Sequence, residues 1–539
     1  MGEGTGLCLS LGREADWMDA RRRRRFVHSK GSVSSPESTG TKLRGAAAQN
    51  RKIGEYYLRR DWRGLLRYAE DKSSDFNHVN WATMFNKLGW MRGEAATIRA
   101  DPAFGRVLRE FEAKVEDEGL DWIGVRQLGT LVHGLAAMGV TSSVVFDKVA
   151  TGVTSERICS TGNPQAIANT AWAFAKIGMK APYFFAHAMS SRNVERLTKV
   201  GNAQAISNTL WAMARLGHSG PGICRAIEDR EVASKIIASE RSQNVASVLW
   251  ALSKFHYECP VFVRCVCENI EEIAHRGSVQ GLSNIAYAFA DLGYFEDAIF
   301  DEVSKHADRV VEKGTMQAAC NILWAYAISG KMKAHEETVK LLWDETMKRP
   351  LQDFTRYSWT TLEIARLFAK AEGISLVVED KKKIDMITKA CKHASYNEKD
   401  IFFDIVARDL RMFGYQGFVR EVSPFKAEGG GDLLKIDLAW EKEMVAVELD
   451  GPSHFLTKPY TNQYRKRRDG PTVAKERLLR KIGWKYISFS YIRHRTMDFM
   501  SKKDRKIVWD TVLGGLDLPK KKPIYRSEAS SYLKGFPLT

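Results

Sequence analysis

Apolar and polar positions in the middle of the chain recur with a period of 37 to 39 residues. Five segments share the pattern and carry an aromatic residue at the same place, namely Trp172, Trp211, Trp250, Tyr287 and Trp324. An earlier copy has His133 there, and weaker copies occur at 80–89 and 361–373. Apolar residues three and four positions apart predict a helix around each aromatic residue.

Capping residues flank each predicted helix at fixed distances. Nine positions before the aromatic residue stand Asn163, Asn202, Arg241, Ser278 and Thr315, and all but Arg241 favour a helix N-cap. Six positions after it stand Gly139, Gly178, Gly217, Gly293 and Gly330, with His256 in the third repeat. Glycine there is typical of a left-handed residue that ends a helix. We expect a first helix of about sixteen residues and a second amphipathic helix, such as 260–276, in each repeat. Such helical pairs stack into an α-solenoid.

Two columns of amide side chains lie on one face of the first helix. The glutamines are Gln165, Gln204, Gln243, Gln280 and Gln317, and the asparagines are Asn169, Asn208, Asn284 and Asn321, with Ser247 in the third repeat. They are candidates for reading RNA bases, one nucleotide per repeat. The alternative is that they satisfy polar groups between repeats. Their invariance from repeat to repeat favours this structural role, because residues that read a sequence should vary.

The pattern changes after the repeats. A helix at about 397–413 precedes strand-like segments at 418–425, 433–440, 444–451 and 484–491, and a helix at 472–482 separates the last two. This order predicts a small α/β module with a mixed sheet.

Charge is concentrated at the end of the chain. The 82 basic and 65 acidic residues give a net charge of +17, which favours an acidic partner such as nucleic acid. Residues 163–350 are almost neutral, with 21 basic and 20 acidic residues, whereas residues 456–506 hold 16 basic and 4 acidic ones. The eight cysteines form no CxxC pair and read as free thiols. No apolar run is long enough to span a membrane, so we expect no membrane partner.

The C-terminal module carries a family resemblance. The strings IDLAW, VAVELDGPSHF and GPTVAKERLLRKIGWKYI resemble the RAP domain. The repeats resemble the octotricopeptide and heptatricopeptide families, and the two resemblances together cover about 120–492. They imply an organellar RNA-binding protein in mitochondria or plastids, which acts in transcript stabilisation, processing or translation. Some members of these families are subunits of organellar ribosomes.

RAP domains are also similar to PD-(D/E)xK nucleases, which hold a divalent cation with two carboxylates and use a lysine to position water. Asp437 and Glu448 stand where those carboxylates belong, but Asp450 takes the place of the lysine. Lys475 and Lys435 are candidate substitutes. Because the lysine is missing, we expect RNA binding without turnover and no cofactor, with Mg²⁺ required only if the module is an endoribonuclease.

The module also carries cations interleaved with aromatic residues, a combination that suits phosphate contact and base stacking. The RNA-binding candidates are Tyr464, Arg465, Lys466, Arg467, Arg468, Lys475, Arg477, Arg480, Lys481 and Trp484.

The first 52 residues include Arg21–Arg25 and a Ser/Gly/Thr-rich stretch, which is typical of a transit peptide or a disordered tail. We therefore expect a mostly α protein with a basic segment at 1–52, a solenoid of about seven repeats at 53–375, a connector at 376–394, a RAP domain at 395–495 and a basic tail at 496–539. The expected location is the mitochondrion, with the plastid as alternative. The expected partner is single-stranded or ribosomal RNA. The alternative functions are a subunit or assembly factor of an organellar ribosome, in contact with ribosomal proteins, and a metal-dependent endoribonuclease.

Overall fold

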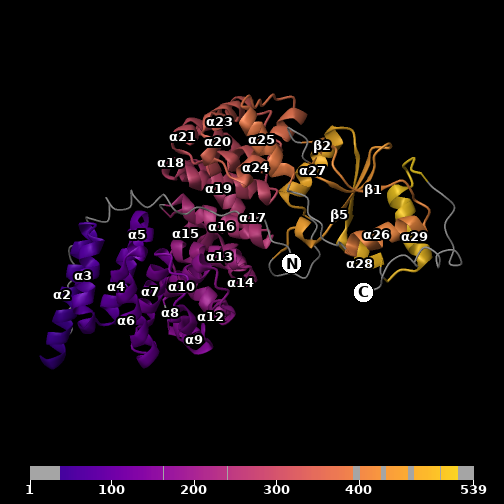
Figure 1. The fold of residues 1–539 in the computed structure, drawn as a ribbon. Coiled ribbons are helices and arrows are strands. Elements are labelled where there is room, and N and C mark those ends of the chain that lie inside the picture. The colour runs from indigo at the N-terminus through magenta and orange to yellow at the C-terminus, as the bar shows by residue number, and fades with distance from the viewer. Residues whose placement is uncertain are drawn as a thin grey trace. The chain divides into compact units, whose positions relative to one another are not determined.

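The computed structural model describes residues 37–161, 163–239, 241–392, 401–426, 432–458, 467–497 and 499–519. The arginine run Arg21–Arg25 therefore lies outside the described residues. The chain divides into two compact units, Met1–Gly201 and Asn202–Thr539. Figure 1 labels the elements of both.

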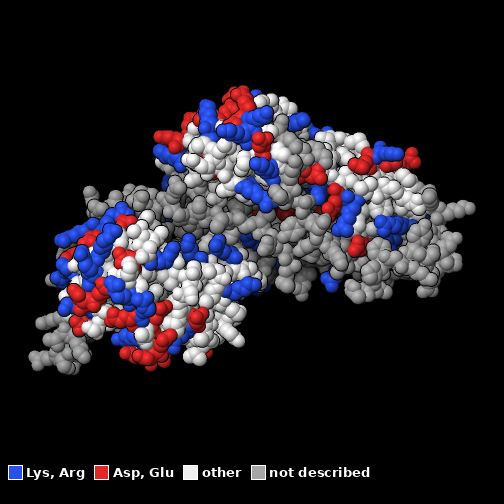
Figure 2. Space-filling model, in the orientation of Figure 1, with Lys and Arg blue, Asp and Glu red and all other residues white. Residues whose placement is uncertain are grey.

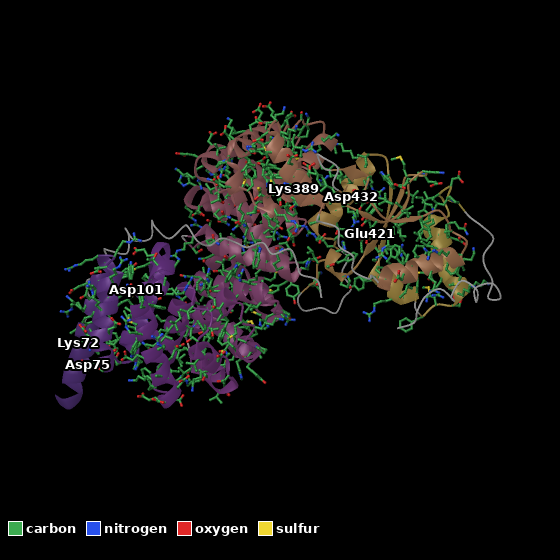
Figure 3. All side chains as sticks on the ribbon, in the orientation of Figure 1. Lys72, Asp75, Asp101, Lys389, Glu421 and Asp432 are labelled. Atoms are coloured by element: carbon green, nitrogen blue, oxygen red, sulfur yellow. The ribbon has the colours of Figure 1, made fainter. Side chains whose placement is uncertain are left out.

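The first unit is a stack of helices. Its elements are α2 (Glu37–Leu58), α3 (Trp62–Lys72), η1 (Ser73–Asp75), α4 (His78–Trp90), η2 (Arg92–Glu94), α5 (Ala95–Ala100), α6 (Pro102–Glu118), α7 (Val125–Ala137), α8 (Val144–Ala150), α9 (Gly152–Thr161), α10 (Pro164–Ile177), α11 (Pro182–Ala188) and α12 (Ser191–Lys199). Asp101, labelled in Figure 3, caps α6 by accepting a hydrogen bond from the backbone N–H of Ala103. Helices α4 and α7 cross so closely that a Cβ on Gly134 would overlap the backbone of Phe85.

The solenoid begins earlier than residue 53, where the sequence analysis placed its start. Ile53 is fully buried on α2, and the side-chain amide of Asn80 donates to the carbonyl oxygen of Ala46 and to Asn50. These contacts join α2 to α4, so the interpretation of the whole segment 1–52 as a tail is wrong for its last residues.

The second unit continues the repeats. Its helices are α13 (Ala203–Leu216), α14 (Pro221–Ile227), α15 (Arg230–Ile237), α16 (Ser242–Phe255), α17 (Pro260–Glu268), α18 (Ile270–Arg276), α19 (Val279–Asp291), α20 (Asp297–Lys305), α21 (Ala307–Lys313), α22 (Met316–Ser329), α23 (Glu336–Lys348), η3 (Leu351–Asp353), α24 (Arg356–Ala371) and α25 (Lys381–Lys392). Helix α25 falls in the predicted connector, where Lys383 donates to the carbonyl oxygens of Met347 and Arg349 and so continues the stacking.

The predicted caps are confirmed. The side chains of Asn202, Ser278 and Thr315 each accept a hydrogen bond from the backbone N–H three residues later. Gly217 and Gly330 are left-handed, and His256 takes the same conformation with φ of 52°. The first helices of these repeats are 13 or 14 residues long, slightly shorter than expected.

The second helix of several repeats is broken into two short helices. The predicted helix 260–276 becomes α17 and α18, which meet at Asn269. The side-chain amide of Asn269 donates to the carbonyl oxygen of Cys265, and a short polar side chain that bonds its own backbone disfavours a continuous helix.

The C-terminal module is a four-stranded mixed sheet in the order β1-β4-β5-β6. Its elements are α26 (Ile401–Met412), β1 (Val419–Val422), β2 (Phe425–Lys426), β3 (Asp432–Leu433), β4 (Ile436–Trp440), β5 (Val445–Asp450), η4 (Pro452–His454), α27 (Gly470–Lys481), β6 (Lys485–Ser490), α28 (Tyr491–Met497) and α29 (Lys502–Leu513). Strands β5 and β6 are parallel, and the pairs β1–β4 and β4–β5 are antiparallel. The predicted mixed sheet is confirmed.

One face of the sheet packs on α26 and α29. The core on this face joins Leu438, Val447 and Phe489 of the strands to Leu410 of α26 and Trp509 of α29. Because Trp509 and Leu513 are fully buried there, the module continues past residue 495, where the sequence analysis ended it. The overall expectation of a helical solenoid followed by a small α/β module is confirmed.

Candidate nucleic-acid interface

Helix α27 holds four of the eight cations that the sequence singled out, namely Lys475, Arg477, Arg480 and Lys481. It begins at Asp469, whose carboxylate accepts a hydrogen bond from the backbone N–H of Thr472, and Pro471 stands in its first turn. Within the second unit the helix contacts β6 and also α19, α22 and α24, and Figure 1 shows α27 beside α24. Some side chains of α27 therefore face the sheet and others face the repeats.

Lys475 faces the sheet and reaches Glu448 of β5. Its Nζ lies 2.6 Å from Glu448 Oε2 and 2.5 Å from the carbonyl oxygen of Lys435. Glu448 is only 3% exposed, and within the described residues its Oε1 has no hydrogen-bond partner. Burial raises the pKa of Glu448 to about 8, against the opposing effect of the Lys475 ammonium.

The three nuclease candidates are thus brought together. Asp437 Oδ2 accepts a hydrogen bond from the backbone N–H of Leu449, next to Glu448, at 2.7 Å. The lysine, however, donates directly to the carboxylate that a metal ion would need, and helix α27 covers that carboxylate. In the described residues no group of three or more His, Cys, Asp or Glu side chains is placed to hold a metal ion. This arrangement does not fit a Mg²⁺ site at Asp437 and Glu448.

Arg477 faces the repeats. Its guanidinium donates to the carbonyl oxygens of Ala327 at 2.6 Å and Ile328 at 3.0 Å, at the end of α22. The last carbonyls of a helix have no partner within that helix and carry partial negative charge. Arg477 therefore caps a repeat helix from outside the repeat.

The same edge of the repeats is contacted twice more. Arg467 donates to the carbonyl oxygen of Gly293 at 2.9 Å and lies 3.8 Å from the ring centre of Tyr294. Thr457 exchanges backbone hydrogen bonds with the turn after α16, donating to His256 and accepting from Glu258. A Cβ on Gly470 would overlap the carbonyl oxygen of Ala290. The turns that end α16, α19 and α22 thus form the docking edge of the RAP-like module, in a position that the sequence analysis interpreted only as helix caps.

The other RNA-binding candidates differ in their availability. Arg468 and Arg480 both pair with Glu476, and Arg480 also donates to the carbonyl oxygen of Tyr486 at 3.1 Å. Lys481 is exposed and makes no ion pair with a described residue. Trp484 is 8% exposed and lines a groove beside β6. Tyr464, Arg465 and Lys466 lie outside the described residues.

The amide columns bond mainly among themselves. Gln165 donates to Asn169 at 2.7 Å, and Gln280 donates to Asn284 at 3.0 Å. Across repeats, Asn321 donates to Asn284 at 3.2 Å, and both are buried. Gln204 accepts from Arg241, and Gln243 donates to Ser247. The asparagines Asn284 and Asn321 are therefore joined within the protein, while Gln317 and Asn208 remain partly exposed. Base reading by these columns stays a prediction.

The aromatic column is core. The rings of Tyr287 and Trp324 stack with centres 4.5 Å apart, and those of His133 and Trp172 lie 4.6 Å apart. All four tryptophans of the column are at most 9% exposed.

A further column of cations escaped the sequence analysis. Fifteen positions before the aromatic residue stand Arg157, Arg196, Lys235, Glu272 and Arg309. Arg157 donates to the carbonyl oxygen of Leu120, Arg196 to that of Cys159, and Arg309 to those of Ala274 and Gly277. Where Glu272 breaks the column, Arg276 pairs with it and donates to the carbonyl oxygen of Ile237. The fixed spacing of this column was the available signal.

The solenoid surface is mixed in charge. Figure 2 shows basic and acidic side chains interspersed over the visible face of the helices α2 to α9.

Of the helices described, none combines the length and the apolar character that crossing a membrane requires. The seven cysteines in the described ranges are free thiols.

Comparison with known families agrees with this architecture. The family model described as RNA-editing substrate-binding complex 6 protein matches residues 76–334, which is most of the solenoid. The RAP domain model matches residues 447–507. No curated protein matches the chain. The two family matches support RNA binding and a role in RNA metabolism. The chain is a helical-repeat protein with a C-terminal RAP domain.

Proposed function

We propose that this protein binds RNA in organellar RNA metabolism without turning the RNA over. The similarity of its repeats to an RNA-editing substrate-binding complex protein supports an RNA ligand, and the RAP domain contacts the repeats of the second unit. Its role would be to stabilise, process or help translate a transcript, in the mitochondrion or alternatively in a plastid.

The burial of Glu448 supports the second part of the proposal, which is that the protein does not cleave the RNA it binds. Glu448 lies under α27 with Lys475 bonded to it. A phosphodiester cannot reach a carboxylate that is 3% exposed and already held by an ammonium group. We therefore derive no cleavage step through Asp437 and Glu448.

In-cell ultraviolet crosslinking of the full chain, followed by sequencing of the recovered RNA, tests RNA binding. Reads confined to a few organellar messenger RNAs support a transcript factor. Reads confined to ribosomal RNA would favour a ribosomal subunit or assembly factor instead. Recovery of no RNA above an uncrosslinked sample would overturn the proposal.

A cleavage assay tests the absence of turnover. The purified chain and its Asp437→Ala variant are incubated with Mg²⁺ and the crosslinked RNA. We expect equal and background-level cleavage from both proteins. Cleavage by the unmodified chain that Asp437→Ala abolishes would establish the endoribonuclease alternative.

A further inference from the structure

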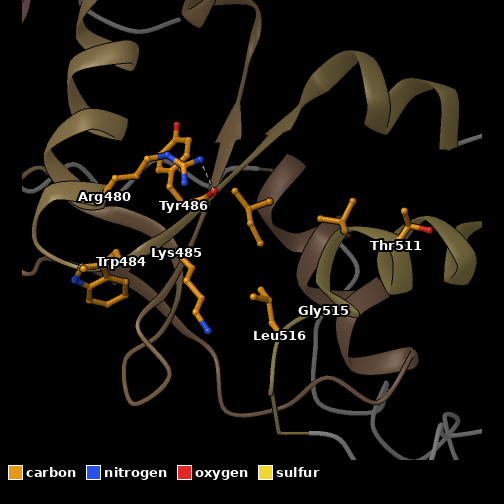
Figure 4. Close-up of a pocket in the computed structure, with 10 residues that line it drawn as sticks. Arg480, Trp484, Lys485, Tyr486, Thr511, Gly515 and Leu516 are labelled. Carbon is orange, nitrogen blue, oxygen red and sulfur yellow. Dashed lines mark hydrogen bonds between the residues drawn. The ribbon is translucent and has the colours of Figure 1, made fainter.

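A groove opens on the RAP domain between the start of β6 and the end of α29 (Figure 4). It is open to solvent and has a volume of about 460 Å³, within the usual range for small-molecule sites. Ten residues line it: Arg480, Gly483, Trp484, Lys485, Tyr486, Ile487, Thr511, Val512, Gly515 and Leu516. The groove includes neither Asp437 and Glu448 nor the residues that contact the repeats.

The lining of this groove combines two chemistries. Trp484, Ile487, Val512 and Leu516 supply aromatic and aliphatic surface, while Arg480 and Lys485 supply positive charge. Figure 4 shows Arg480 beside Tyr486 at one end, with Trp484, Lys485 and Leu516 toward the other. No acidic side chain is among the ten lining residues.

The two cations that line the groove, Lys485 and Arg480, differ in their partners within the described parts of the chain. Lys485 is exposed, and of the described residues none forms an ion pair with its ammonium group. Lys481, four positions earlier, is exposed and unpaired in the same sense. Arg480 is different, because Glu476 and the carbonyl oxygen of Tyr486 hold its guanidinium in place. The groove therefore has one oriented cation, Arg480, at its end and one lysine, Lys485, whose ammonium group makes no ion pair with a described residue.

We propose that this groove takes one unpaired nucleotide of single-stranded RNA. The base packs against Trp484 and the aliphatic wall, and Lys485 contacts an adjacent phosphate. Apolar surface beside free positive charge, without acidic residues, complements a nucleotide, which joins a flat base to an anionic backbone. A duplex hides its base faces, so the ligand is single-stranded. This inference rests on the RNA binding proposed above and assigns it a place.

The test replaces Lys485 with glutamate. The probe is a fluorescein-labelled oligouridylate, and its affinity for the full chain is measured over a series of salt concentrations. We expect Lys485→Glu to bind about tenfold more weakly, and the slope of log affinity against log salt to fall by about 0.7, the amount for one lost phosphate contact on a single strand. Lys485 is exposed, so the melting temperature should not change.

A matched control uses the same charge change elsewhere on the domain. Lys503 is exposed near the start of α29, whereas the groove meets the other end of that helix. Lys503→Glu should change the affinity less than about twofold, because a distant surface charge is largely screened by salt.

Crosslinking locates the base independently of the charge change. The same oligouridylate carrying 4-thiouridine is photocrosslinked to the unmodified chain, and the attached peptide is identified by mass spectrometry. We expect the label on the segment that contains Trp484 and Tyr486. If Lys485→Glu bound RNA normally and crosslinks formed only outside this segment, the groove would not be the nucleotide site, although the proposal that the protein binds RNA would stand. If oligoglutamate displaced the labelled oligouridylate as strongly as unlabelled RNA does, the ligand of the groove would be an acidic peptide and not a nucleotide. A chain that binds no RNA would overturn both proposals.

Discussion

Arginines of the repeats and arginines of the RAP domain use the same interaction for two different purposes. Arg309 and Arg349 donate to carbonyl oxygens at the end of the preceding repeat and so join repeat to repeat. Arg467 and Arg477 donate to carbonyl oxygens at the ends of repeat helices and so join the domain to the repeats. The forked guanidinium suits such sites because it can bond two carbonyls at once. Positive charge counted along the sequence therefore overstates what is available to RNA.

The two regions also bury carboxylates differently. Glu363, in the repeats, has both oxygens bonded to Arg366 at 2.6 and 2.8 Å. Glu448, in the RAP domain, has one oxygen bonded to Lys475, and its other oxygen has no partner in the described residues. A lysine is a point charge and satisfies only one side of a carboxylate, so Glu448 is the less well compensated group.

Glu448→Gln is expected to give the largest effect, seen as a change of stability with pH. Burial raises the pKa of Glu448 from 4.5 to about 8 in the folded protein. The folded state therefore binds a proton more tightly than the unfolded state, and this contribution is complete below pH 4.5 and lost as the pH rises to 8. Relative to the glutamine variant, the native chain should lose roughly 5 kcal/mol across this window. Urea unfolding at a series of pH values measures the difference.

A pH dependence of stability with the opposite sign would show that the ion pair with Lys475, and not burial, controls the ionisation of Glu448. If Lys475 kept Glu448 ionised, the stability difference would stay flat between pH 5 and 8 and fall only in acid.

Arg477→Ala should have the next largest effect, because it removes the cap that holds the RAP domain on α22. Two charge-assisted hydrogen bonds are lost and two carbonyls remain partly covered, so we expect a loss of about 3 kcal/mol in unfolding free energy. Lys481→Ala, on the same helix but exposed, should change stability by less than about 0.5 kcal/mol.

Gly470→Ala tests the same docking without removing a charge. The Cβ of an alanine at position 470 would overlap the carbonyl oxygen of Ala290, so the backbones of α27 and α19 must move apart. We expect faster hydrogen exchange in α27 and at the end of α19 than in the native chain. Unchanged exchange in both segments would show that the docking edge does not depend on this close approach.

The repeats could be predicted from the sequence because helix caps depend only on residues that are close in sequence. Asn202 and Gly217 act within one helix turn, so their spacing alone marked the start and end of α13. The break at Asn269 was missed because the amphipathic pattern continues through it while the side chain bonds the backbone. Local patterns thus located the helices but not their interruptions.

The candidate site was only partly predictable. The sequence correctly placed Asp437, Glu448 and Lys475 together, because adjacent strands and the helix that follows them bring these positions close. It grouped Arg477 with Lys481 as equivalent cations. Their difference depends on Ala327 and Ile328, which lie about 150 residues away in sequence, and no local pattern carries that information.

Arg309→Ala measures the contact between repeats and should cost less than the contact between domain and repeats. Arg309 donates to the carbonyl oxygens of Ala274 at 3.0 Å and Gly277 at 2.7 Å. Water can replace part of this interaction at the solenoid surface, so we expect a loss of about 2 kcal/mol in unfolding free energy. Lys313→Ala, in the same helix and with an exposed pair to Glu312, should change it by less than about 0.5 kcal/mol. Equal effects would show that the column of cations does not join the repeats.

Asn321→Ala should give the smallest change and decides the role of the asparagine column. Asn321 is buried and donates to Asn284 of the preceding repeat, so its loss should cost about 1 kcal/mol in unfolding free energy. RNA affinity, measured well below the melting temperature, should stay unchanged because no base edge reaches a fully buried amide. Reduced affinity with unaltered stability would instead support base reading. In that case the asparagine column would belong with Lys485 among the groups that face RNA, and the division between the two regions would fail.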